Sequence, residues 1–176
     1  MNLPASTAAG AKSAEMSAQF VHLHIHSEFS LAEGLLKVKS AVGEATQRHI
    51  PAMALTDRNN LFALVKFYET GLAKGVKPIL GAELWISSPG QEPAGRIVVL
   101  AQNAEGYKNL LALISYSYTD AERRGEITEQ SLFDHEQGLI VLSGGVGGHL
   151  WHSVGNADYQ AALATLARWQ TVFADR

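Results

Sequence analysis

The stretch that organises this chain runs from Phe20 to Ser27 and reads Phe-Val-His-Leu-His-Ile-His-Ser. Side chains alternate between the two faces of a β-strand, so a strand here places His22, His24 and His26 on one face. The other face carries only aliphatic side chains, those of Val21, Leu23 and Ile25. The pattern therefore predicts a strand with one face toward a core and an imidazole face at a cavity mouth or strand end.

The three histidines have two chemical interpretations. Neutral imidazole nitrogens bind zinc, iron and manganese, and two of them two residues apart on a strand can converge on one cation. The acidic loop Glu28–Glu33 follows directly, which favours a metal site. The competing interpretation is a polar strand end whose histidines only form hydrogen bonds. The residues alone leave both interpretations open.

The bulk composition is that of one globular domain, with 176 residues of which 47% are hydrophobic and 18% charged. The net charge is −3, and no cluster of lysine or arginine exceeds a pair such as Arg123–Arg124. A domain that wraps nucleic acid alone usually carries a basic stripe, so we expect contact with DNA only through a larger assembly. The absence of cysteine excludes disulfides, thiolate metal sites and a cysteine nucleophile.

The cellular setting is suggested by three features. The Ala/Ser-rich segment Met1–Gln19 lacks the apolar core of a signal peptide, and we expect it to be a disordered leader. No apolar run approaches the roughly 20 residues of a membrane span, so no membrane partner is expected. A chain without cysteine also fits a reducing cytoplasm.

Apolar periodicity predicts alternating strands and helices after the histidine stretch. Because the strands are apolar on both faces, we expect an α/β fold with a mostly parallel sheet and polar residues gathered after the strands. In the second helix Leu61, Leu64, Val65, Tyr68 and Leu72 share one side, and in the last helix Leu163, Leu166, Ala167, Trp169 and Gln170 lie near the inner face. The predicted helices are 35–49, 61–74, 104–118, 128–135 and 157–173, and the predicted strands are 52–56, 79–86, 96–102 and 139–142.

Two turns carry open questions. Gly144 and Gly145 follow the last strand, where they permit either a close backbone approach or a plain tight turn. Asp57 follows the strand 52–56, and its carboxylate would either orient a ligand or cap the helix 61–74.

Several motifs together resemble PHP (polymerase and histidinol phosphatase) domains, in the branch at the N-terminus of bacterial replicative DNA polymerase III alpha subunits. They are the histidine stretch with Glu33-Gly-Leu, Pro51-Ala-Met-Ala-Leu-Thr-Asp57, residues 60–68, Gly75–Glu83, Gly106-Tyr-Lys-Asn-Leu110 and Gly138–Gly144. The resemblance covers Phe20–Arg176. It implies a distorted (β/α)7 barrel with up to three metals at the carboxyl ends of its strands, here incomplete because the chain stops before the closing strands.

The resemblance also implies a site. The family's ligand positions fall on His24, His26, Glu33 and Glu83, which would hold zinc or manganese. Two further ligand positions, histidines in the active members, are Arg58 and Arg96 here, and a third is Gly145. Arginine stays protonated and cannot ligate a metal, but it pairs with carboxylates. We therefore expect Arg58 and Arg96 to form internal ion pairs in a vestigial, inactive metal site.

The implied function is that of a scaffold in a replicative polymerase, which docks the proofreading exonuclease subunit and other subunits of the holoenzyme. The parent protein would be a DNA-directed DNA polymerase using magnesium in other parts of its chain. The alternative is a metal-dependent phosphoesterase or 3′–5′ exonuclease acting through the His/Glu site. A third, lesser alternative is a stand-alone histidinol-phosphatase-like enzyme.

Overall fold

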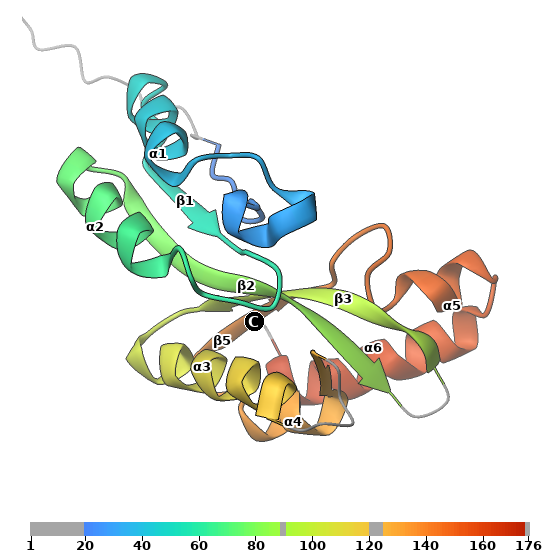
Figure 1. Cartoon of the computed structure of the whole chain (residues 1–176). Coiled ribbons are helices and arrows are strands. Elements are labelled where there is room, and N and C mark those ends of the chain that lie inside the picture. Colours follow the sequence, from blue (N-terminus) through green and yellow to red (C-terminus); the bar gives the residue numbers. More distant parts are fainter. Residues whose placement is uncertain (1–19, 89–90, 120–124, 175–176) are drawn as a thin grey trace, which may run out of the picture.

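Helices and strands alternate along the residues that the structure, a computed structural model, describes: 20–88, 91–119 and 125–174 (Figure 1). The expected leader 1–19 lies outside these residues. None of the helices in the described part of the chain has the length and apolar character to span a bilayer. The elements are η1 (Glu28–Glu33), α1 (Val38–Gln47), β1 (Ala52–Leu55), α2 (Leu64–Lys74), β2 (Lys77–Ser88), β3 (Gln91–Ala101), α3 (Ala104–Thr119), β4 (Glu126–Thr128), α4 (Glu129–Asp134), β5 (Leu139–Leu142), α5 (Trp151–Gly155) and α6 (Tyr159–Phe173).

The sheet is mixed and is built around the long strand β2. This strand pairs in parallel with β1 and β4 and antiparallel with β3, and β3 pairs antiparallel with β5. The prediction of a mostly parallel sheet is therefore wrong, although the α/β class is confirmed. Only residues 89–90 separate β2 from β3, too few for the dozen or so residues that a parallel crossover needs. The mixed sheet with its helices is consistent with part of a barrel.

The segment Phe20–Ser27 lies beside β1 but pairs with it irregularly. The backbone N–H of Ala54 donates to the carbonyl of His22 (2.7 Å), and that of Thr56 donates to Ile25 (2.9 Å). Between these bonds the segment advances three residues while the opposite chain advances two. Strict alternation is thereby lost, so the prediction of one continuous strand with three histidines on one face is wrong.

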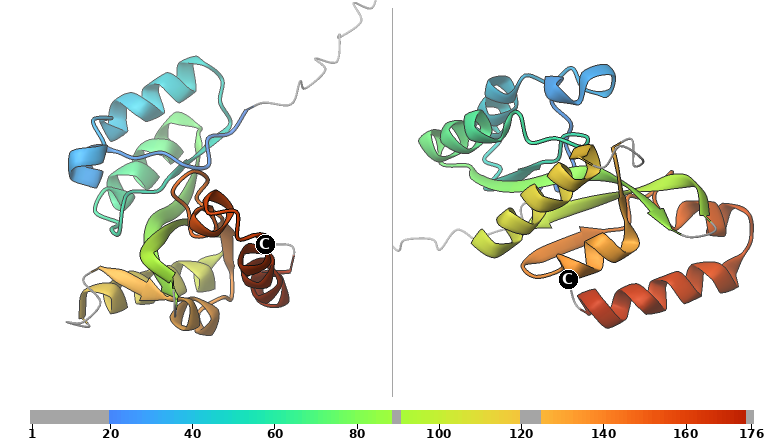
Figure 2. Two further views of the ribbon diagram at one scale, coloured as in Figure 1. Left: turned by 90° about the vertical axis from the view of Figure 1, so that its right-hand side faces the viewer. Right: turned by 60° about the horizontal axis from the view of Figure 1, so that its bottom comes forward.

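Two main apolar clusters hold the helices to the sheet. Figure 2 shows α1 and α2 (cyan and green) together toward one end of the sheet, and α3, α4 and α6 (yellow to red) toward the other. The larger cluster lies between β2, β3 and β5 and the helices α3, α4 and α6, and its largest fully buried members include Leu84, Ile97, Leu110 and Leu132. The second joins α1 and α2 to β1 around Val42, Met53 and Phe67. This arrangement leaves the carboxyl end of β1, the middle of β2 and the histidine segment close together.

The buried face of α2 is not the expected one. Val65 and Leu72 are 65% and 58% exposed, whereas Phe67 and Gly71 are buried. Gly71 approaches β2 so closely that an added Cβ would lie 3.3 Å from the Cβ of Pro78. A face with a glycine lets the helix pack closer to the sheet than the larger aliphatic side chains allow. A count of apolar residues at helical spacing does not detect such a face, because glycine adds no side chain to it.

The face of α6 was also predicted incorrectly. Trp169 is buried as expected, but the other buried side chains are Thr165 and Phe173. Leu163 and Leu166 are 58% and 41% exposed. The ring of Trp169 stacks on the fully buried imidazole of His149, with 5.2 Å between centroids.

Two helical glycines give opposite predictions for substitution by alanine. In α1, a Cβ on Gly43 would meet only the Lys74 Nζ, at 3.9 Å, so Gly43→Ala is expected to stabilise the fold by about 1 kcal/mol. In α3, a Cβ on Gly106 would collide with the backbone carbonyl of Gly138, so Gly106→Ala is expected to destabilise it by about 3 kcal/mol. Urea denaturation of both variants checks this. Equal effects of the two substitutions would contradict it.

Candidate metal centre

Three potential metal donors meet where the histidine segment crosses β2. Glu83 lies in the middle of β2 and is fully buried. The His24 Nε2 is 3.0 Å and the His26 Nε2 is 3.6 Å from the Glu83 Oε2, and the two Nε2 atoms are 3.3 Å apart. One donor atom from each of the three residues lies within 4.8 Å of the others. His22 is not in this group, and its ring packs edge-on against Phe20, 4.7 Å between centroids.

Two arginines occupy the same region and contact its carboxylates. The Arg58 Nη1 donates to the Glu33 Oε1, and the other oxygen of Glu33 lies 3.9 Å from the His26 Nδ1. The Arg96 Nη1 is 3.6 Å from the Glu83 Oε2, the oxygen that both histidines approach. The structure thus brings four expected ligand positions and two arginines into one cluster, and each carboxylate has a guanidinium beside it. They are His24, His26, Glu33, Glu83, Arg58 and Arg96.

The backbone around β2 explains why the arginines converge there. Arg58 follows β1 and forms an isolated parallel bridge with Glu83, supported by a 2.8 Å hydrogen bond from the N–H of Asn59 to the Glu83 carbonyl. Arg96 stands opposite Trp85 in the β2–β3 ladder. Gly144 has a φ of +77°, and a Cβ there would collide with the Arg96 carbonyl, so the glycine turn after β5 makes a close backbone approach.

Asp57 holds the histidine segment in place. Its carboxylate accepts hydrogen bonds from the backbone N–H of Ser27 (2.6 Å), the hydroxyl of Ser27 (2.7 Å) and the hydroxyl of Ser30 (2.7 Å). Asp57 does not cap α2, which begins at Leu64 after the N-cap residue Ala63 and has no side-chain cap. The carboxylate fixes the chain immediately after His26, and its role is therefore to position the site.

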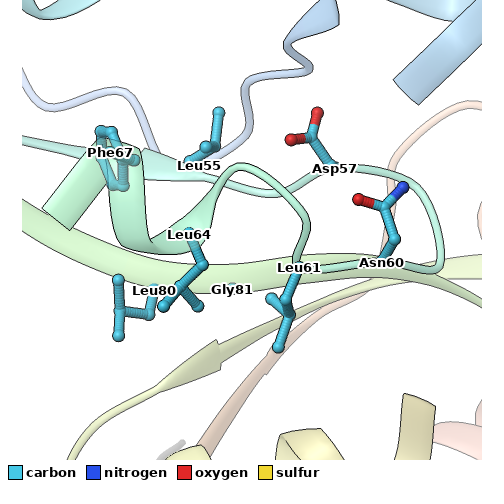
Figure 3. A pocket seen from close by; sticks show the side chains of 8 residues that line it. All are labelled: Leu55, Asp57, Asn60, Leu61, Leu64, Phe67, Leu80 and Gly81. Carbon is cyan, nitrogen blue, oxygen red and sulfur yellow. The ribbon is translucent and has the colours of Figure 1, made fainter. Parts of the chain in front are cut away.

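A small cavity lies beneath Asp57 and is too small to be a ligand site. Its volume is about 10 Å³, which is room for about one water molecule. Figure 3 shows that the polar ends of Asp57 and Asn60 point away from the aliphatic side chains of Leu61 and Leu64. A ligand would therefore bind at the cluster of His24, His26 and Glu83 and not in this cavity.

The pKa values of Glu83 and His26 are shifted in opposite directions by their contact. Burial acts to raise the pKa of Glu83, but hydrogen bonding with His24 and His26 and the charges of His26 and Arg96 outweigh it, lowering the pKa from 4.5 to about 2. The pKa of His26 is raised, first by its hydrogen bond with Glu83, against the opposing effect of burial. The carboxylate is therefore ionised at neutral pH and available to a cation.

The low pKa of Glu83 predicts a pH-dependent stability in the metal-free protein. A lowered folded-state pKa contributes stability that is present above the unfolded value of 4.5 and is lost as the pH falls toward about 2. We expect the free-energy difference between the wild type and Glu83→Gln to shrink over this range. Urea denaturation in EDTA at several pH values measures it, and a constant difference would contradict the shift.

The donor set fits one divalent cation. Two imidazole nitrogens and a carboxylate oxygen are common metal ligands, and the buried Glu83 Oε2 faces the Nε2 atoms of His24 and His26. The guanidinium of Arg96, however, competes for the same carboxylate oxygen. These residues therefore fit a single divalent cation in competition with a side-chain cation.

Trp85 is a residue of the site that the sequence analysis did not identify. It lies two residues after Glu83 on the same face of β2, and the Cζ atoms of Arg58 and Arg96 are 5.1 and 6.0 Å from its ring centroid. That two-residue spacing is the signal that could have identified it.

The chain is an α/β protein with a histidine–carboxylate cluster that could hold a metal ion beside its central strand, and comparisons with known proteins identify its family. Residues 22–176 match the PHP domain. The DNA polymerase III subunit alpha of Pseudomonas aeruginosa is 40% identical over 164 residues, and that of Vibrio cholerae is 42% identical over 165. These matches cover 92% and 89% of this chain and 14% of each relative.

A solved two-domain protein from Bacteroides vulgatus, which contains a predicted PHP-like metal-dependent phosphoesterase, has a TM-score of 0.44 at 17% identity, covering 69% of this chain and 33% of that one. The match over residues 22–176 shows that the chain belongs to the PHP domain family. The chain therefore spans about one-seventh of the length of each of the two polymerase subunits, of which the match covers 14%.

Proposed function

We propose that this chain is the PHP domain of a DNA polymerase III alpha subunit that replicates DNA in the cytoplasm. The observation that carries this proposal is the 40% identity over 164 residues, which extends over almost the whole chain. Template-directed DNA synthesis with magnesium would then belong to other parts of the polypeptide. The net charge of −3 fits a domain that meets DNA only through the full-length protein.

Within that protein we propose a scaffold role without hydrolysis. The ion pairs of Arg58 with Glu33 and of Arg96 with Glu83 support it, because each carboxylate already has a cation beside it. A guanidinium supplies charge and hydrogen bonds but neither a metal ligand nor a general base. His24 and His26 would then cover and stabilise the buried carboxylate of Glu83 and would not hold a catalytic metal.

The proposed partners are the proofreading exonuclease subunit and other subunits of the polymerase III holoenzyme. A domain with a neutralised site and near-neutral charge is better suited to protein contacts than to binding a phosphate chain. Co-purification of the full-length protein with the purified exonuclease subunit, with and without residues 1–176, tests this directly. Equal binding by the shortened protein would contradict the docking role.

The scaffold role is tested by metal content and hydrolysis together. We expect purified protein to hold well under one zinc or manganese per chain by elemental analysis, and to release no phosphate or nucleotide from model phosphoesters or single-stranded DNA. Stoichiometric metal, lost together with hydrolysis in His26→Ala, would contradict the proposal. Lys108→Ala, at an exposed pair far along the chain, serves as the matched control.

The alternative function is a metal-dependent phosphoesterase or 3′–5′ exonuclease. The convergence of His24, His26 and Glu83 within 4.8 Å favours it. A zinc or manganese ion held there would supply Lewis-acid chemistry, namely polarisation of a phosphoryl oxygen and activation of water. The chain's own contribution would be to hold that ion through these three donors and to orient His26 through Asp57 and Ser27.

A further inference from the structure

Trp85 lies between the two arginines of the candidate site. It is directly opposite Arg96 in the β2–β3 ladder, and it shares a face of β2 with Glu83, the residue that Arg58 bridges. The strand register therefore places Arg96 directly beside Trp85, and Arg58 beside Glu83, two residues before it on β2. The guanidinium carbons lie 5.1 Å (Arg58) and 6.0 Å (Arg96) from the ring centroid, within the range of cation–π contacts.

The indole is a contact that the two arginines share. Arg58 otherwise donates to Glu33, on η1. Arg96 otherwise lies 3.6 Å from the Glu83 Oε2 and donates to the carbonyl of Val146 at 3.0 Å. These other contacts lie on separate loops and strands. Among the described residues, Trp85 is therefore the side chain that contacts both guanidinium groups where they approach the carboxylates.

A hydrogen bond does not explain why a tryptophan occupies this position. Its Nε1 is buried and has no hydrogen-bond partner among the described residues, and a buried donor without an acceptor costs stability. What the residue supplies is the face of an aromatic ring, and tryptophan attracts cations more strongly than tyrosine or phenylalanine does. The ring face is thus the property that a test must vary.

We infer that Trp85 is a positioning residue that keeps Arg58 and Arg96 over the carboxylates and thereby excludes divalent cations from His24, His26 and Glu83. The inference rests on the proposed scaffold function. A cation at these donors competes with Arg96 for the Glu83 Oε2, and displacing Arg96 also breaks its contact with the indole. Weakening the ring face therefore shifts the competition toward the metal.

The experiment uses the full-length protein after EDTA has removed bound metal. It measures the affinity for zinc by competition with a chromophoric chelator. In Trp85→Leu, which has no ring, we expect the apparent zinc affinity to rise about tenfold over wild type, a size set by the loss of two cation–π contacts. In Trp85→Phe, which keeps a ring face, it should stay within about threefold. Adding His26→Ala to Trp85→Leu should abolish the gain, which would locate the ion.

Two outcomes would overturn the inference. One is an unchanged zinc affinity in a Trp85→Leu protein whose circular dichroism matches wild type, and the other is an equal gain in Trp85→Phe. If Trp85→Leu does not fold, Trp85→Met, whose unbranched side chain adapts better to an irregular space, carries the same test. Tight stoichiometric zinc in the wild type would contradict the proposed function instead, while the ratio between the leucine and phenylalanine variants would still decide the role of Trp85.

Discussion

Replacing both Arg58 and Arg96 by histidine is expected to produce a chain that binds about one zinc ion where the wild type binds far less than one. The substitution removes the two cations that compete for Glu33 and Glu83 and adds two imidazole nitrogens in their place. Backbone anchoring makes this feasible, because the bridges of Arg58 with Glu83 and of Arg96 with Gly148 do not depend on the side chains. Elemental analysis after dialysis measures the change.

The matched control is the double variant with lysine at both positions. Lysine keeps the positive charges but offers no neutral donor at neutral pH, so it is expected to remain metal-free. If the lysine variant also took up zinc, the guanidinium geometry would be the barrier and not the charge. If the histidine variant stayed metal-free while folded, the arginines would not be what keeps the site empty, and the scaffold proposal would lose its physical basis.

The parts of the fold that the sequence predicts well are those with one dominant local signal. The strand 139–142 is observed as Leu139–Leu142, because a short apolar run ends at two glycines. The C-terminus of α2 at Gly75 is also as predicted, since its φ of +71° suits glycine. His24 and His26 converge because the segment that carries them, although irregular, still lies beside β1.

The errors arise where a tertiary contact overrides the local pattern. Apolar periodicity marked Val65 and Leu72 as inward, but the small surface at Gly71 decides which side of α2 meets the sheet. β3 begins at Gln91, whereas the predicted strand began at residue 96. The antiparallel pairing of β2 and β3 follows from this extension, through residues whose composition indicated a loop. The three donors to Asp57 come from residues about 30 positions away, a distance over which no spacing rule operates.

Asp57→Ala is expected to lower the free energy of unfolding by about 3–5 kcal/mol. The carboxylate is 2% exposed and accepts hydrogen bonds from the N–H of Ser27 and the hydroxyls of Ser27 and Ser30. Its removal leaves these donors buried without their charged acceptor, and each such donor costs about 1–3 kcal/mol. The loop η1 that carries Glu33 loses its anchor at the same time, so Arg58 loses its partner as well.

Urea denaturation of wild type, Asp57→Ala and Asp57→Asn measures this effect. Asparagine keeps the shape and one accepting oxygen, so about half of the loss is expected. Glu44→Ala is the control: Glu44 pairs with Arg48 at 3.2 Å, but the two side chains are 60% and 72% exposed, and an exposed pair contributes at most about 1 kcal/mol. A loss under about 1 kcal/mol in Asp57→Ala would mean that the hydroxyls find other acceptors, and that the histidine segment is held by its backbone bonds to β1.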